Sequence, residues 1–128
     1  MPVRIKDVMN PNVVTVEATA LLMDALELMF AKSVKSLVVP ARSESDAFGI
    51  LTFTDVAKKV LAGDERLEML NVYDIMTKPC LSVHEDLDIR YAARMMTDLN
   101  ISRMIVTEGS RLRGIVSLSD LVKSLLKK

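Results

Sequence analysis

The segment Gly49-Ile50-Leu51-Thr52-Phe53-Thr54-Asp55 recurs 65 residues later as Gly114-Ile115-Val116-Ser117-Leu118-Ser119-Asp120. In both copies a glycine and two apolar residues are followed by two hydroxyl residues, which a third apolar residue separates, and by a final aspartate. A recurrence of this kind indicates that one structural unit occurs twice, so the repeat decides how every other element is interpreted. It extends well beyond these seven residues.

The rest of the chain aligns with itself at a shift of 67 residues. Residues 3–39 align with 70–106 without a gap, and the alignment matches Asp7 with Asp74 and Met9 with Met76. The slip of two residues falls in a polar stretch, where a connecting loop absorbs an insertion at little cost. We therefore predict two repeats, residues 1–62 and 71–128, joined by a linker over residues 63–70.

Hydrophobic periodicity predicts the order β-α-β-β-α in each repeat. The first two strands of a repeat should be parallel because a helix connects them, and the last two should form an antiparallel hairpin. A unit of this size buries only about 60% of its extended-chain surface, so two units should share their apolar faces. The predicted fold class is α+β, with two β-α-β-β-α units in pseudo-twofold pairing. The strands are expected at 13–16, 36–39, 48–51, 80–83, 103–106 and 112–116, and the helices at 21–32, 55–61, 87–99 and 120–126. Thr19 and Asp86 are the expected caps of the two longer helices.

Composition narrows the possible functions. The 17 basic and 17 acidic residues of this 128-residue chain balance, so the phosphate attraction that drives nucleic-acid binding has no source. A single cysteine and a single histidine exclude an internal disulfide and leave too few ligands for a structural zinc site. No apolar run reaches about 18 residues and no signal peptide is visible, so we expect a cytoplasmic protein that does not associate with membranes. The hydrophobic content of 50% predicts an oligomer.

The repeated motif has two interpretations. Asp55 and Asp120 could each accept two hydrogen bonds from the vicinal diol of a ribose, while the nearby hydroxyls and amides bind its phosphate. The alternative is that Ser or Thr, followed three residues later by an acid, simply caps the next helix. The recurrence of the same glycine, hydroxyls and aspartate favours ligand binding.

In these residues the chain resembles a tandem pair of cystathionine-β-synthase (CBS) domains, the Bateman module. The doubled motif carries the resemblance, together with Asp7-Val8-Met9 and Asp74-Ile75-Met76 at the start of each repeat. The resemblance implies two clefts between paired units and disc-like dimers. It also implies binding of AMP, ATP or a related adenosyl compound such as S-adenosylmethionine or NAD.

The resemblance further implies which residues bind. Asp120 would hold the ribose hydroxyls, Ser117 and Ser119 would approach ribose and phosphate, and Arg103 would contact phosphate. The first repeat would complete this site with Asn10, Val13 and Val14. The related site would use Asp55, Thr52 and Thr54 with Thr77, Cys80 and Leu81. Ser36 stands where the first site has Arg103, so we predict that the Arg103 site is the stronger one.

Two of these residues have a plainer interpretation. Arg103 could be a surface ion-pair partner. Cys80 aligns with Val13 of the first repeat and could be a small buried apolar residue.

The sequence thus predicts a stand-alone regulatory module that binds an adenosyl ligand and signals occupancy to an effector protein by a conformational change. The alternative is a ligand-free structural module that forms a homodimer or docks on a partner enzyme. Enzymatic activity is not expected, because the sequence offers no activated nucleophile and no base with a partner.

Overall fold

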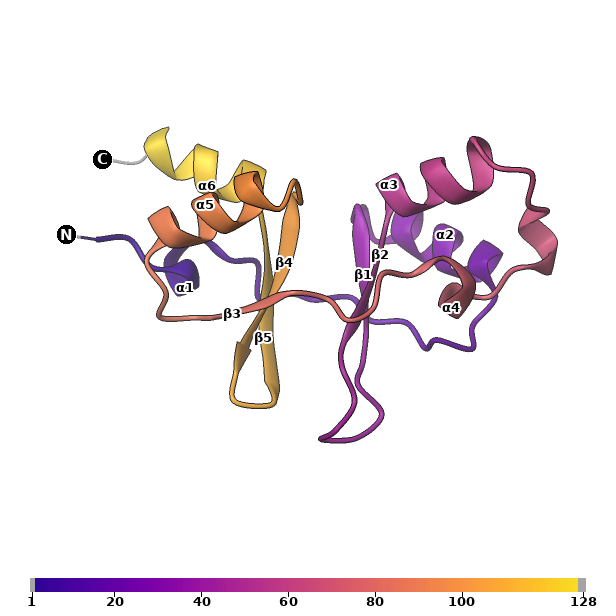
Figure 1. Cartoon of the computed structure of the whole chain (residues 1–128), viewed down its shortest axis with the longest axis horizontal. Helices are drawn as coiled ribbons and strands as arrows, with labels where there is room; N and C mark the ends of the chain where they lie inside the picture. The colour runs from indigo at the N-terminus through magenta and orange to yellow at the C-terminus, as the bar shows by residue number, and fades with distance from the viewer. Residues whose placement is uncertain (1, 127–128) are drawn as a thin grey trace. The chain divides into compact units, whose positions relative to one another are not determined.

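The computed structural model describes residues 2–126, which form two compact units (Figure 1). One unit consists of residues 14–80 and is called the continuous unit. The other combines residues 2–13 with residues 81–126 and is called the discontinuous unit. Each has its own hydrophobic core and is described separately.

The continuous unit contains one antiparallel hairpin with helices packed against it. Strand β1 (Ser36–Val39) pairs with β2 (Gly49–Thr52), and Thr15 adds a parallel bridge to Val38. The helices are α2 (Leu22–Ala31), α3 (Phe53–Val56), which continues as a π-helical turn (Ala57–Leu61), and α4 (Val72–Ile75), which follows a 3-10 turn (Leu67–Met69). Apolar residues of α2, both strands, the linker and α4 form a single buried cluster.

The discontinuous unit contains a three-stranded sheet. Strand β3 (Ser82–His84) runs parallel to β4 (Arg103–Glu108), which pairs antiparallel with β5 (Arg111–Ser117). The helices are α1 (Ile5–Val8), α5 (Ile89–Asp98) and α6 (Leu118–Lys123), and a 3-10 turn (Ser124–Leu126) follows α6. Its core joins Ile5 of α1 to buried residues of all three strands, α5 and α6.

The predicted α+β class and strand directions are confirmed. The strand expected at 13–16 is reduced to the single bridge of Thr15, however, and both predicted helix caps are wrong. Helix α2 begins after Leu21, with no side-chain cap. Helix α5 begins after Asp88, whose carboxylate accepts the N–H of Arg90 at 2.9 Å. Asp86 instead forms an ion pair with Lys6 at 3.0 Å. The carboxylate that we expected to cap the helix is thus bound to a residue near the start of the chain.

The compact units do not follow the boundaries of the repeats. Residues 2–13 belong to the first repeat but pack with the second, and residues 63–80 pack with the first. Ile5 and Val72 occupy equivalent positions in the repeat alignment, and both side chains are fully buried in the core of the opposite repeat's unit. The sequence alignment could not show this exchange of opening segments. The alignment would be the same whether an opening segment packed on its own repeat or on the other one.

Several large apolar side chains remain exposed on helices and turns. Phe30 is 72% exposed and stacks on Phe53 with 5.5 Å between ring centroids, and Leu61, Leu125 and Leu126 are about as open. Within residues 2–126, none of the helices has both the length and the apolar character needed to cross a bilayer.

Candidate functional site

Each repeated motif forms a complete capping box. The N–H of Asp120 donates to Ser117 Oγ at 3.1 Å, and the N–H of Ser117 donates to Asp120 Oδ2 at 2.8 Å. Thr52 and Asp55 make the same pair of bonds at 3.2 and 3.0 Å. The capping interpretation of the motif is therefore correct, and a cap of this kind contributes about 1 kcal/mol.

Capping does not occupy the whole of each carboxylate. Asp7 and Asp74 accept the equivalent backbone bonds at the starts of α1 and α4, each at 2.9 Å, and both are exposed. Asp55 and Asp120 are half-buried and each keeps a second oxygen beyond its cap. Capping through Oδ2 thus leaves Oδ1 of each carboxylate for another hydrogen bond.

The motif glycines make room for the chain itself. A Cβ on Gly114 would lie 2.8 Å from the carbonyl oxygen of Asn10 and 2.9 Å from Met9 Sδ. A Cβ on Gly49 would lie 3.1 Å from Met76 Sδ. Both glycines thus leave room for the opening segment of the opposite repeat. The match of Met9 with Met76 was the sequence signal for this contact.

Arg103 lies directly opposite Ser117 in the β4–β5 register. Residues paired in this way point to the same face of a sheet, about 5 Å apart at Cβ, so Arg103 emerges beside the motif. Its side chain is half-buried and forms no ion pair with a carboxylate of residues 2–126. The ion-pair interpretation is therefore not realised, and the planar guanidinium keeps a donor fork suited to phosphate. In the continuous unit, Ser36 occupies this position opposite Thr52.

Asn10 and Thr77 are equivalent in the repeat but differ in what their side chains bind. Both segments pair antiparallel with the motif strand, Asn10 with Ile115 and Thr77 with Ile50. The Asn10 side-chain oxygen accepts the N–H of Asn12 at 2.9 Å. The Thr77 hydroxyl instead donates to Asp55 Oδ1 at 3.1 Å. Asp55 therefore has both oxygens bonded, whereas Asp120 Oδ1 has no hydrogen-bond partner among the residues that the structure describes.

Most of the residues predicted for each binding site lie in the same compact unit as the aspartate of that site, but two do not. Because of the exchange, Asn10 and Val13 lie in the same compact unit as Asp120, and Thr77 and Cys80 lie with Asp55. Val14 and Leu81 fall in the opposite units. The binding roles of all these residues stay predictions. Cys80 is half-buried, and Thr54 and Ser119 are exposed beside their motifs.

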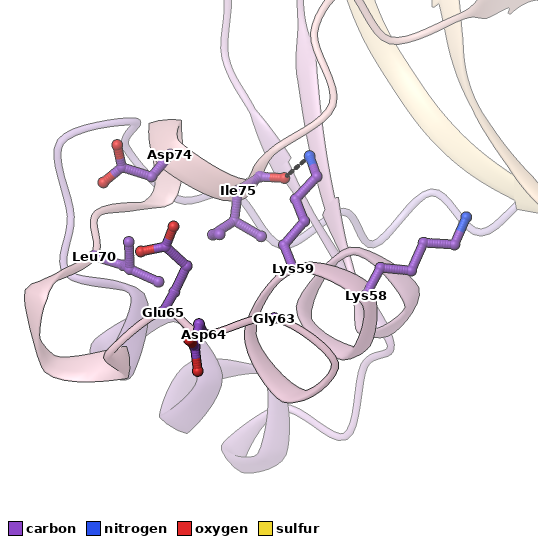
Figure 2. Close-up of a pocket in the computed structure, with 8 residues that line it drawn as sticks. All are labelled: Lys58, Lys59, Gly63, Asp64, Glu65, Leu70, Asp74 and Ile75. Atoms are coloured by element: carbon purple, nitrogen blue, oxygen red, sulfur yellow. Dashed lines mark hydrogen bonds between the residues drawn. The ribbon is translucent and has the colours of Figure 1, made fainter.

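A cavity of about 460 Å³ in the continuous unit lies apart from these residues (Figure 2). Two lysines and three acids line it: Lys58, Lys59, Asp64, Glu65 and Asp74. Lys59 Nζ donates to the carbonyl oxygen of Ile75 at 2.8 Å, and the Asp74 carboxylate caps α4. Its charged groups are thus partly committed to the fold, and none of the predicted site residues line it. Within residues 2–126, no three His, Cys, Asp or Glu side chains gather as metal ligands would.

Comparison with known proteins agrees with this architecture. The CBS domain model matches the chain twice, over residues 5–62 and 72–127. The chain belongs to the CBS domain family. The two matches coincide with the two sequence repeats.

Relatives of known structure share the CBS fold. The chain is 38% identical to the hexameric CBS-CP12 protein from bloom-forming cyanobacteria, covering 94% of this chain and 69% of that one, with a TM-score of 0.89. It is 25% identical to the CBS domain pair of protein MJ0100, solved with 5-methylthioadenosine and S-adenosyl-L-methionine, covering 98% and 97% with a TM-score of 0.84.

The uncharacterized protein MK0525 of Methanopyrus kandleri is 27% identical over 122 residues. That match covers 94% of this chain but only 62% of MK0525.

Proposed function

We propose that this CBS pair is a regulatory module that binds an adenosyl ligand at the Asp120 motif of the discontinuous unit. Asp120 accepts the ribose hydroxyls on its open oxygen, and Arg103 binds the phosphate of an adenine nucleotide such as AMP or ATP. The observation that carries the proposal is that Arg103, a half-buried residue, pairs with Ser117 in the sheet and has no acidic partner in the described chain. The adenosyl ligands in the MJ0100 structure support the ligand class.

The module acts by binding rather than by chemistry. Occupancy shifts a conformational equilibrium only as far as the ligand prefers one state over the other. The site residues supply hydrogen bonds and one cation, so a nucleotide incubated with the protein should be recovered unchanged. The responding partner is proposed to be an effector protein.

Titration calorimetry of the wild type, Arg103→Met and Asp120→Ala tests this function. The wild type should bind AMP or ATP. Asp120→Ala should weaken binding of every adenosyl ligand by roughly 1–3 kcal/mol, because the diol loses a charged acceptor. Arg103→Met should weaken AMP by a similar amount, yet leave 5-methylthioadenosine nearly unchanged because it has no phosphate.

Asp7→Ala is the matched control. It removes a capping carboxylate from the same compact unit but lies outside the proposed site, so it should lower stability without lowering affinity. No binding of AMP, ATP, S-adenosylmethionine, 5-methylthioadenosine or NAD by the wild type at millimolar concentration would refute the proposal.

The complete capping boxes and the exposed apolar side chains favour a second candidate, a ligand-free assembly module. It would form a homodimer or a larger oligomer through side chains such as Phe30 and Leu125. The CBS-CP12 relative is hexameric, which supports an assembling module. Light scattering would then report an oligomer, while added nucleotides would leave the melting temperature unchanged.

A further inference from the structure

We propose that Thr77 is a specificity-determining residue, which blocks ligand binding at the Asp55 motif and so leaves Asp120 as the preferred site. This inference rests on the proposed function, because it concerns which of two related motifs takes the ligand. It is carried by the hydrogen bond from the Thr77 hydroxyl to Asp55 Oδ1 at 3.1 Å.

The two carboxylates start from the same geometry. Each caps its helix through Oδ2 and is half-buried, and each motif strand pairs with the opening segment of the opposite repeat. They differ in the second oxygen. To accept both hydroxyls of a ribose diol, a carboxylate that caps a helix needs its other oxygen free. At Asp55 the Thr77 hydroxyl already donates to that oxygen, Oδ1. Thr52 Oγ1 also donates to Asp55 Oδ2 at 3.0 Å.

The residue that replaces Thr77 in the other unit forms no hydrogen bond to Asp120. Asn10 has the same backbone pairing to its motif strand, but its side-chain oxygen accepts a bond from Asn12. A ligand at Asp120 therefore meets an open oxygen, whereas a ligand at Asp55 must first displace the Thr77 hydroxyl. Exchange of one neutral hydrogen-bond donor for another leaves the diol little net gain.

The difference in charge between the two motifs also favours ligand binding at Asp120 over Asp55. Ser36 supplies no cation opposite Thr52, and the neighbouring Lys78 is held by Asp46 at 2.9 Å. Asp55 thus lacks both an open oxygen and the counterpart of Arg103. Removal of the Thr77 hydroxyl should free Asp55 Oδ1 but supply no cation. The Asp55 motif should then favour an uncharged nucleoside.

Amide chemical shifts of Asp55 and Asp120 read the two motifs separately during titration with AMP and with adenosine. In the wild type, Asp120 should saturate at lower ligand concentration than Asp55. Thr77→Val should tighten adenosine binding at Asp55 by about three- to tenfold, the scale of one hydrogen bond, and leave Asp120 unchanged. Thr77→Ser keeps the hydroxyl and is the matched control, so it should behave as the wild type.

The reverse exchange tests the same residue position in the other unit. Asn10→Thr should weaken binding at Asp120 more than Asn10→Val, because only the threonine supplies a blocking hydroxyl. Wild-type binding at Asp120 with no effect of Thr77→Val at Asp55 would overturn this inference and leave the proposed function standing. No shift at either motif in any variant would overturn both.

Discussion

Asp46, in the loop between β1 and β2, is a carboxylate held by partners on two segments. It accepts the N–H of Arg42 at 2.9 Å and the Nζ of Lys78 at 2.9 Å. The Arg42 N–H and then the Lys78 amine hold the pKa of Asp46 well below its ordinary value of 3.8. Because the pKa is lower in the folded state, Asp46 stabilises the fold above the unfolded pKa, and this contribution is lost as the pH falls.

We therefore expect Asp46→Asn to reduce the acid sensitivity of the protein. The free energy of unfolding of the wild type should drop more steeply than that of the variant as the pH falls below about 4. Urea titrations at a series of pH values measure the difference. Parallel curves for the two proteins would contradict the assignment.

Individual side chains were only partly predictable. The sequence singled out Asp55 and Asp120, and of its two interpretations of the motif the structure confirms helix capping through Oδ2, while ligand binding stays a prediction. The bond from Thr77 to Asp55 was not predictable, since it depends on which repeat the opening segment packs against.

Helices α2 and α5 end in the same left-handed turn. Ser33 and Asn100, equivalent in the repeat, have φ values of 55° and 54°. The N–H of Val34 donates to the carbonyl oxygen of Met29, and the N–H of Ile101 to that of Met96, both at 2.9 Å, which is the Schellman pattern. A serine pays a steric cost for this conformation that glycine avoids.

Ser33→Gly should accordingly stabilise the protein by roughly 0.5–1 kcal/mol, seen as a higher urea midpoint at unchanged slope. Asn100→Gly should gain less, because asparagine tolerates the left-handed region better than serine. A lower midpoint for Ser33→Gly would show that the turn is not strained.

The interiors of elements were easier to predict than their ends. Leu22, Ala25 and Met29 of α2 are buried, as their helical spacing predicts, whereas Phe30, which the same spacing places on that face, is 72% exposed. The caps were wrong because a local signal such as Asp86 competes with tertiary partners, here Lys6, that the local sequence does not contain.

For the whole molecule, the exchange of opening segments determines which residues share a core. Leu70, Val72 and Ile75 belong to the core of the continuous unit, although the linker and the second repeat supply them. The repeats themselves were predictable from alignment, but the partner of each opening segment was not.

A fragment of residues 14–80 should therefore be more stable than a fragment of residues 1–62. The shorter repeat-based fragment loses three buried apolar side chains, each worth about 1.5–3 kcal/mol. Circular dichroism with urea unfolding compares the two fragments. Equal stability would mean that α4 contributes nothing to that core.

The exchange also makes the continuous unit an insertion within the discontinuous one, since residues 13 and 81 both belong to the latter. A tether pulling on both ends of the chain would load the discontinuous unit first. The continuous unit would bear no tension until the discontinuous unit had unfolded. In an optical trap, the discontinuous unit should therefore unfold before the continuous one.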